Sequence, residues 1–258
     1  MTTTTKRVTE LDGEELAELL GLIDSSDSVE LKLTIPESDH RATLAKLEVD
    51  ALEAQIRQVF FFDTPDLAVN RSGVAVRARR VQGKTGDTVV KLRPVVPDTL
   101  PADVRNSESI KVEVDALPGG YVCSASMKGE APNDKIREAI LGGGSVRRLF
   151  SKEQRTFYEA HAPDGIGLDD LSIMGPIFVL KLKQSAVDRE RKLVVEMWFY
   201  PDGSRILELS TKCAPSEAFQ AGIEARAYLE NLGLDLSAAQ QTKTKTALDF
   251  FSAELSAR

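Results

Sequence analysis

The sequence contains few of the residues on which thiol and histidine chemistry depend. Cysteine and histidine each occur only twice in 258 residues, and tryptophan occurs once. Cys123 and Cys213 lack Cys-x-x-Cys spacing and cannot build a disulfide framework, so we expect both to be reduced packing residues. His40 and His161 stand alone, without the spacing of metal ligands, and we expect both at the surface.

Long apolar runs are also missing. No run approaches the roughly 18 residues of a membrane span, and the opening MTTTTKRVTE lacks the apolar stretch of a secretory signal. We therefore expect a cytoplasmic protein without a membrane partner, beginning with a frayed tail. The phosphate-binding pattern G-x-x-x-x-G-K followed by Ser or Thr is absent as well, and we interpret Gly142-Gly143-Gly144 as the stop of a helix.

Positive charge is in the minority over the whole chain. The 33 Lys and Arg residues face 40 Asp and Glu residues, which gives a net charge of −7. Nonspecific nucleic-acid binding requires an exposed basic stripe, so this balance argues against a nucleic-acid partner. With 42% hydrophobic residues, the chain can bury a sizeable core as one large domain or two small ones.

Against this acidic background, strand after strand carries charged residues two positions apart, most of them basic. These residues are Glu30, Lys32, Arg77, Arg79, Lys91, Arg93, Lys111, Glu113, Asp115, Lys181, Lys183, Glu196, Glu208 and Lys212. Side chains alternate sides along a strand, so each set points the same way. One such strand would be ordinary surface alternation. Seven of them, closed into a curved sheet, would gather roughly eight cations and several carboxylates in one cavity, which predicts a site for a polyanion and its metal.

The order of the segments predicts an α+β fold, an antiparallel β tunnel or barrel with a charged interior and flanking helices. We divide the chain into an N-terminal tail and helix (1–27), a tunnel domain (28–213) and C-terminal helices packed on the tunnel (214–258). Helices are expected near residues 13–24, 39–47, 134–141, 215–232 and 237–254. Strands are expected near residues 28–35, 53–64, 74–81, 87–94, 108–115, 146–160, 166–172, 177–184, 192–200 and 205–212. The segment from Pro118 to Pro132 is expected to be irregular.

Several segments also form an ordered set: VELKL, FFFDTPDLAVNRSGVAVRARR, VVKLRP, KVEVD, SKEQR, LDDLSIMGP and ILELS. This set, which runs from about residue 28 to about residue 212, resembles the CYTH superfamily of adenylate cyclases and thiamine triphosphatases, also called triphosphate tunnel metalloenzymes. The resemblance implies a tunnel of antiparallel strands that binds a triphosphate through basic residues and one or two divalent metal ions through acidic ones.

The resemblance also implies roles for particular residues. It implies that phosphates are held by Lys32, Arg77, Arg79, Lys91, Arg93, Lys152 and Arg155, and that the metal is faced by Glu30, Glu113 and Glu208. We take Glu30, Lys32, Arg77 and Arg79 as the catalytic residues. The charge pattern adds Lys181, Lys183 and Lys212 as substrate-binding residues and Glu196 as a metal ligand. Asp169 is a further candidate ligand, although an aspartate beside a strand end is more often a turn residue.

Two serines depart from the family pattern. The family opens with Glu-x-Glu-x-Lys, but here Ser28 takes the place of the first acid, and Ser210 takes the place of the second acid in the late Glu-x-Glu pair. Each serine removes a charged oxygen ligand that Mg²⁺ would use. Lys181 and Lys183 would in addition repel a second cation. We therefore expect one Mg²⁺ or Mn²⁺ ion.

The function expected from these features is the divalent-metal-dependent hydrolysis of tripolyphosphate, a nucleoside triphosphate or thiamine triphosphate. Phosphoryl transfer needs positioning and charge stabilisation more than covalent chemistry from the protein. An adenylate cyclase and a noncatalytic module that binds polyphosphate or a phosphorylated metabolite stay open as alternatives, and the oligomeric state is open too. Trp198 could stack on a base, or could pack at the barrel rim. Lys243 and Lys245 are expected on a solvated helix face.

Overall fold

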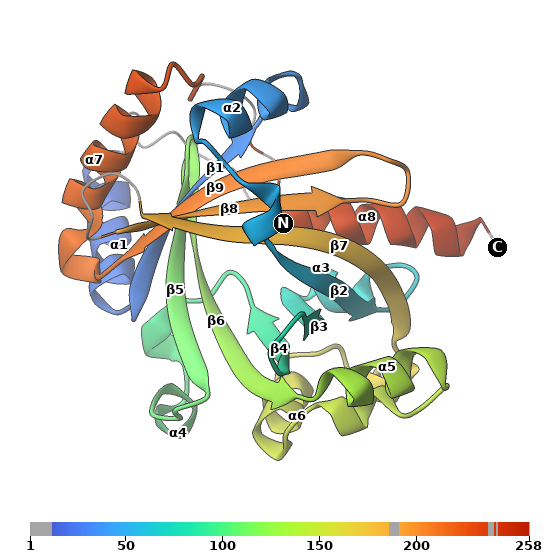
Figure 1. Ribbon diagram of the computed structural model, residues 1–258. Helices are drawn as coiled ribbons and strands as arrows, with labels where there is room; N and C mark the ends of the chain where they lie inside the picture. The colour runs from blue at the N-terminus through green and yellow to red at the C-terminus, as the bar shows by residue number, and fades with distance from the viewer. Residues whose placement is uncertain (1–11, 186–190, 237–239, 241, 258) are drawn as a thin grey trace.

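The protein forms one closed β-barrel surrounded by helices (Figure 1). The computed structural model describes residues 12–185, 191–236, 240 and 242–257, and these contain nine strands and eight α-helices. The strands are β1 (Ser28–Ile35), β2 (Gln55–Asp63), β3 (Val74–Val81), β4 (Gly86–Leu92), β5 (Ile110–Leu117), β6 (Gly120–Ala131), β7 (Ser172–Ser185), β8 (Lys192–Phe199) and β9 (Arg205–Cys213). The helices are α1 (Gly13–Asp24), α2 (His40–Lys46), α3 (Ala68–Arg71), α4 (Ala102–Arg105), α5 (Asn133–Leu141), α6 (Lys152–Glu159), α7 (Ala218–Asn231) and α8 (Lys243–Ser256).

The barrel follows the order β1-β5-β6-β4-β3-β2-β7-β8-β9 and closes where β9 pairs with β1. Every neighbouring pair is antiparallel except β1 and β5, which are parallel. The predicted fold class, an antiparallel β tunnel flanked by helices, is confirmed. Because β1 and β5 run side by side, their inward side chains meet at the same level of the barrel, and this places Glu30 next to Asp115.

The alternation along the strands separates an apolar outer face from a charged inner one. On β3, Val74, Val76 and Ala78 are almost fully buried on the outside, whereas Arg77 and Arg79 point inward between them. The largest apolar cluster covers this outer face with residues of α1, α5 and α6, and a second cluster lies beneath α7. These clusters keep the barrel closed, because each outward apolar row has a helix to pack against.

Two predicted strands were wrong. The chain from Val146 to Leu149 is a 3-10 turn and residues 152–159 form α6, where a strand was predicted over 146–160. Ser151 and Gln154 form a capping box at the start of α6, and Gln154, Phe157 and Tyr158 lie on its buried face. The capping box and the spacing of three to four residues between buried positions favour a helix over the predicted strand. The predicted strand 166–172 is likewise a 3-10 turn over Leu168–Asp170 that leads into β7.

The segment predicted to be irregular, Pro118 to Pro132, contains the longest strand of the cationic side of the barrel, β6. Its outward residues Cys123, Ala125 and Met127 are all buried, and both cysteines of the chain are free. Small side chains alternate here with serine, which gives a weak sequence signal for a strand that pairs along its length with β4 and β5.

The other elements lie within a few residues of their predicted positions, apart from the last helix, which begins at Lys243. The predictions for residues 1–11 and for 237–239 and 241 fall outside the described residues. None of the helices in the described ranges is both long and apolar enough to cross a membrane.

Candidate active site

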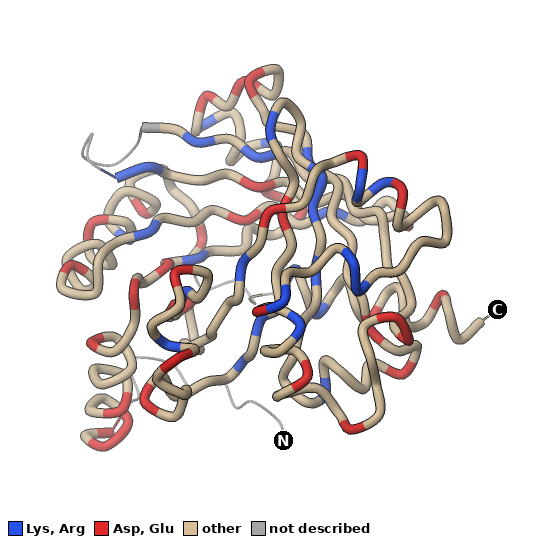
Figure 2. The backbone as a smooth tube through the Cα atoms, turned by 90° about the horizontal axis from the view of Figure 1, so that it is seen from below, with Lys and Arg blue, Asp and Glu red and all other residues tan. Residues whose placement is uncertain are grey.

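The inward positions of all nine strands place charged residues in the barrel. In Figure 2, basic and acidic positions recur along neighbouring strands of the barrel. The charged residues at inward positions include Glu30, Lys32, Arg57, Arg77, Arg79, Asp87, Lys91, Lys111, Glu113, Asp115, Lys128, Glu130, Lys181, Lys183, Glu196, Glu208 and Lys212. They fall into three sectors around the barrel, one rich in carboxylates, one rich in cations and one that contains both.

The first sector is a cluster of three carboxylates on the parallel pair β1 and β5. Glu30, Glu113 and Asp115 each offer an oxygen atom, and these atoms lie within 4.8 Å of one another. The register explains the arrangement, because Ser28 is the partner of Glu113 and Glu30 is the partner of Asp115. We call these three residues the carboxylate cluster. Hard oxygen ligands at this spacing fit a divalent cation such as Mg²⁺ or Mn²⁺.

Lysines hold the carboxylate cluster in its ionised form. Lys32 Nζ lies 2.7 Å from Asp115 and 3.2 Å from Glu30, and Lys91 Nζ lies 3.5 Å from Asp115. Burial alone would raise the pKa of Asp115, but the attraction of Lys91 and Lys32 outweighs burial and lowers that pKa below its ordinary value. Burial acts on Glu30 in the same way, and Lys32 lowers the pKa of Glu30. The carboxylates of Asp115 and Glu30 are therefore both ionised at neutral pH, as metal binding requires.

Glu113 has its own partners. Lys212 forms an ion pair with it, and the Ser28 hydroxyl donates a hydrogen bond of 3.2 Å to its Oε2. Ser28, which stands where the family pattern has an acid, thus borders the carboxylate cluster and supplies a neutral oxygen there. Ser210 is the register partner of Lys32 and is buried.

The second sector is a wall of cations on β2, β3 and β6 and at the residue that follows β4. Its residues, which we call the cationic wall, are the half-buried Arg57, Arg77 and Arg93 and the exposed Lys128. Within the described part of the chain, none of the four has a carboxylate oxygen within 4.0 Å. The pKa of Arg77 is lowered, mainly by burial and next by the positive charge of Arg79. The charged guanidinium of Arg77 therefore lacks enough negative charge nearby to balance it. Uncompensated cations inside a barrel are expected to bind an anion.

Arg79 and Lys91 border this wall but are compensated. Arg79 makes a two-pronged contact with Asp87, with its Nε 2.9 Å from Oδ1 and its NH2 nitrogen 2.8 Å from Oδ2. Lys91 is shared with Asp115 of the carboxylate cluster, and burial lowers its pKa. An incoming phosphate would thus meet both free and already paired cations.

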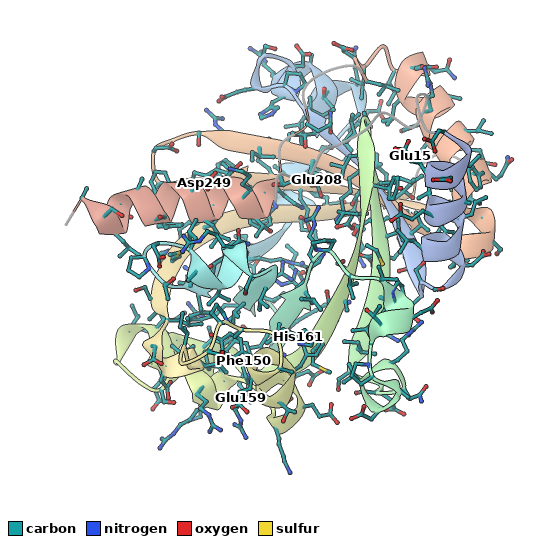
Figure 3. All side chains as sticks on the ribbon, turned by 180° about the vertical axis from the view of Figure 1, so that it is seen from behind. Glu15, Phe150, Glu159, His161, Glu208 and Asp249 are labelled. Carbon is teal, nitrogen blue, oxygen red and sulfur yellow. The ribbon has the colours of Figure 1, made fainter. Side chains whose placement is uncertain are left out.

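The third sector is a group of two acids and two lysines on β7, β8, β9 and α8, which we call the Lys243 cluster. Lys243 Nζ lies 2.5 Å from Glu196 and 2.6 Å from Glu208, and Lys181 Nζ lies 2.7 Å from Glu196. Figure 3 shows Glu208 near the N-terminal end of α8, with Asp249 farther along the helix. The prediction that Lys243 lies on a solvated face was wrong, because the helix directs this side chain into the barrel.

The reason for this direction is that α8 packs against the inside of the barrel. Val59, Val179 and Trp198 face inward by register, and they form one apolar cluster with Leu248 and Phe251 of α8. The Tyr200 hydroxyl fixes the start of the helix by donating a hydrogen bond of 3.1 Å to the Lys243 carbonyl. The helix therefore closes one end of the tunnel.

Trp198 belongs to this apolar packing. Its side chain is only 4% exposed, its indole N–H donates a 3.1 Å hydrogen bond to Glu196, and Lys243 Nζ lies 5.0 Å from the ring centroid. The ring is covered by α8 and is not presented to the open part of the tunnel. Of the two predicted roles of Trp198, stacking on a base or packing, its surroundings fit packing.

Several predicted site residues lie away from these sectors. Lys152 and Arg155 belong to α6, where Lys152 is exposed and Arg155 donates to the Phe150 carbonyl. Asp169 accepts hydrogen bonds from the Ser145 hydroxyl and the Arg147 amide, so its carboxylate stabilises a turn and does not join the carboxylate cluster.

Two further expectations concern exposure. Lys183 lies near the end of β7, two residues beyond Lys181, and is exposed. His40, expected at the surface, is buried, with its Nε2 atom 3.0 Å from the Ile35 carbonyl, because α2 folds back over the end of β1. Half-buried His161 lies beside Phe157, with ring centroids 4.7 Å apart. Neither histidine belongs to any of the three sectors.

Sequence reasoning missed four members of the site. Asp115 was part of the charge pattern but was not assigned to the metal, although it follows Glu113 by two positions. Lys128 lay in the segment predicted to be irregular, and Arg57 had no charged residue two positions away in its strand. Lys243 had no local signal, because only the packing of α8 brings it to Glu196.

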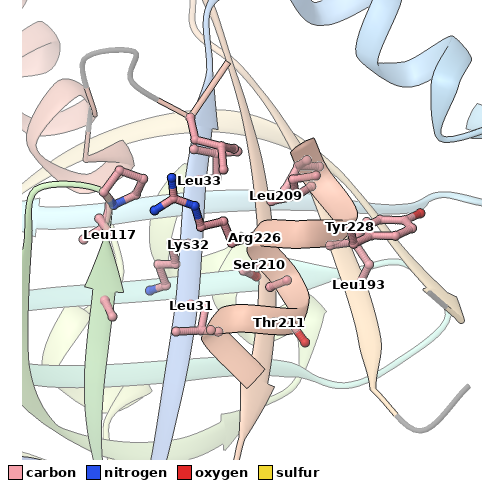
Figure 4. A pocket seen from close by; sticks show the side chains of 16 residues that line it. Leu31, Lys32, Leu33, Leu117, Leu193, Leu209, Ser210, Thr211, Arg226 and Tyr228 are labelled. Carbon is pink, nitrogen blue, oxygen red and sulfur yellow. The ribbon is translucent and has the colours of Figure 1, made fainter. Parts of the chain in front are cut away.

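A separate cavity of about 370 Å³ lies outside the barrel, between α7 and strands β1 and β9 (Figure 4). Leucine is the commonest residue of its lining, and Lys32 and Ser210 are the tunnel-facing residues that border it. The cavity contains no member of the carboxylate cluster, and its apolar wall is unsuited to a polyanion.

Comparison with known proteins supports the fold. No family model and no curated protein matches this sequence. A solved Bacillus halodurans protein described as a candidate adenylate cyclase shares 13% sequence identity, with a TM-score of 0.60 over 86% of this chain and 97% of that chain. A solved Hippeastrum protein, described as an adenylyl cyclase candidate with a dominant triphosphatase activity, shares 15% identity, with a TM-score of 0.62 over 86% of this chain and 95% of that chain. At such low identity the likeness concerns the fold alone.

Proposed function

We propose that the protein is a triphosphatase of the CYTH type, which hydrolyses a triphosphate in its tunnel with the help of one divalent metal ion. The observation that carries this proposal is the joint presence, in one closed barrel, of a carboxylate cluster that fits a cation and a cationic wall that lacks carboxylate partners. The segment order that resembles the CYTH superfamily and the triphosphatase activity described for the Hippeastrum protein support it.

The carboxylate cluster would hold the metal, with oxygens of Glu30, Glu113 and Asp115 as ligands. A bound divalent ion neutralises phosphate charge and activates water. The cationic wall would hold the phosphate chain beside it, with Arg77 and Arg57 gripping oxygens through planar guanidinium groups. The same cations stabilise the negative charge that develops on the leaving phosphate, which is the larger part of catalysis in phosphoryl transfer.

The closed end of the tunnel favours an inorganic triphosphate over a nucleotide. Among the described inward positions, the aromatic residues are Phe61 and Trp198, and both belong to the apolar cluster that α8 covers. A nucleoside triphosphate would need an aromatic or apolar surface for its base near the phosphates. Adenylate cyclase activity, the function suggested by the names of both neighbours, has the same requirement and is the second candidate.

A phosphate-release assay with tripolyphosphate, ATP and thiamine triphosphate, each with Mg²⁺ or Mn²⁺ titrated separately, tests this proposal. We expect release from tripolyphosphate that depends on the metal and is fastest among the three substrates. Glu113→Gln should lower the rate by about 100-fold, since one charged ligand is lost. Glu108→Gln, which changes an exposed acid just before β5, is the matched control.

Cyclic AMP formed from ATP without free phosphate would point to the cyclase instead. Absence of turnover for all three substrates, combined with tight binding of tripolyphosphate, would leave a binding module as the function and contradict the hydrolase.

A further inference from the structure

The Lys243 cluster contains two acids that the sequence assigns to metal binding. Glu196 and Glu208 are register partners on β8 and β9, and both are buried. Two adjacent carboxylates inside a barrel would ordinarily form a cation site. Here the ammonium group of Lys243 lies at hydrogen-bond distance from both, 2.5 Å from Glu196 and 2.6 Å from Glu208.

The charges of this cluster balance without a metal. Its two carboxylates face two ammonium groups, because Lys181 also contacts Glu196 at 2.7 Å. The indole N–H of Trp198 donates a third hydrogen bond to Glu196, at 3.1 Å. Lysines face the acids of the carboxylate cluster as well, but that cluster offers three carboxylates to a cation. The Lys243 cluster offers only two, and one ammonium group lies at hydrogen-bond distance from both, where a cation would bind.

The position of Lys243 is fixed by the fold and is not a chance surface contact. The residue is the first of α8, and the helix beyond it is inserted among inward-facing apolar residues of the barrel. The Tyr200 hydroxyl holds the carbonyl of Lys243, and the Ser252 hydroxyl donates to the Pro65 carbonyl at 2.6 Å farther along the helix. These contacts keep the backbone of Lys243 beside the two acids.

We propose that Lys243 is an internal cation that takes the place of a metal ion between Glu196 and Glu208. The carboxylate cluster is then the only divalent-metal site of the described tunnel, and the Glu196 and Glu208 pair anchors α8. Lys243 is in this account a positioning residue, which neutralises the two acids and fixes the helix that closes the tunnel. The claim about the Glu196 and Glu208 pair does not depend on hydrolysis; only the identity of the other site rests on the proposed function.

The test counts bound metal in the absence of any triphosphate. Equilibrium dialysis with Mn²⁺ should find one ion per chain in the wild type and one additional, weaker ion in Lys243→Met, because removal of the ammonium group leaves the pair with a net negative charge. Lys245→Met is the control, since Lys245 lies on the same helix, is exposed and pairs with Asp249. It should bind the same number of ions as the wild type.

Tryptophan fluorescence locates the additional ion. Trp198 is the single tryptophan of the chain and lies 3.1 Å from Glu196. Paramagnetic Mn²⁺ bound to the pair should quench its emission in Lys243→Met in a saturable way, and diamagnetic Mg²⁺ should reverse the quenching by competition. Adding Glu208→Gln to Lys243→Met should abolish the gain. If Lys243→Met fails to fold, Lys243→Gln keeps a polar head of similar length and serves for the same two measurements.

A wild-type chain that binds two Mn²⁺ ions would overturn the proposal, as would a folded Lys243→Met variant with unchanged stoichiometry and unchanged quenching. A wild type that binds no ion while the variant gains one would contradict the metal site assigned to the carboxylate cluster and would leave the role of Lys243 supported. The two ideas can therefore fail separately.

Discussion

Replacement of Asp115 by asparagine is expected to lower the free energy of unfolding by about 3 kcal/mol at neutral pH, the lower end of the range for breaking a buried ion pair. The Asp115 side chain is almost fully buried between Lys32, at 2.7 Å, and Lys91, at 3.5 Å. A neutral amide keeps the shape but leaves two ammonium groups inside the barrel with less compensation. The loss of stability stays near the lower end of that range because Lys32 still has Glu30 as an ion-pair partner at 3.2 Å. Urea unfolding of both proteins measures it.

The pH dependence of this difference has a definite sign. Burial would raise the pKa of Asp115, but Lys91 and Lys32 lower it below the ordinary value of 3.8. The contribution of the ionised group to stability is therefore fully present above about pH 4 and is lost as the pH falls through the lower pKa of the folded state. The gap between wild type and Asp115→Asn should stay constant from pH 7 to about pH 4 and shrink as the pH falls further.

The control for this prediction is Asp103→Asn in α4, an exposed aspartate for which we expect a change within about 0.5 kcal/mol. An Asp115→Asn variant as stable as the wild type at pH 7 would show that the two lysines do not depend on this carboxylate.

The second prediction is that Arg77→Met changes ligand affinity and stability in opposite directions. Arg77 faces the tunnel without a carboxylate within 4.0 Å among the described residues, and burial lowers its pKa. Its removal should relieve an uncompensated buried charge, so the free protein should be as stable as the wild type or more stable. Affinity for tripolyphosphate should nevertheless fall about 10- to 100-fold, as expected for loss of a charge-assisted hydrogen bond. Calorimetry and thermal unfolding measure the two effects.

The matched control is Arg80→Met, because Arg80 lies three residues after Arg77 on β3 and points to the outer face. It donates 3.1 Å from its Nε to the Asn133 carbonyl and contacts Gln58. This variant should keep the affinity for tripolyphosphate and lose some stability. If Arg77→Met binds tripolyphosphate as tightly as the wild type, Arg77 does not belong to the binding site.

The comparison of the two arginines shows how far the sequence could predict the site. Side chains alternate between the two faces of a strand, and this alone places Arg77 on the opposite face of β3 from its apolar neighbours. Closure of the barrel then follows from the number of strands with this pattern. The same logic placed Glu30 and Glu113 at inward positions. Their approach to within a few ångströms was not predictable, because it depends on the parallel pairing of β1 and β5, which the sequence pattern does not encode.

Other features depended on information that a single sequence does not carry. Lys128 lies on a strand of small residues whose β-forming tendency comes from its partners on both sides. Ser151 and Gln154 cap α6, and the strand predicted there neglected this local signal. Lys243 is one of two lysines two positions apart on α8, and only the insertion of the helix into the barrel decides that it is the one that faces the acids.

The most direct test of the tunnel as a triphosphate site is a calorimetric titration of tripolyphosphate into the wild-type protein in excess chelator. Because the cationic wall has no carboxylate partners among the described residues, we predict saturable binding without metal, together with no phosphate release until Mg²⁺ or Mn²⁺ is restored. Absence of binding in chelator, with or without recovery on addition of the metal, would contradict the claim that these cations form the anion site.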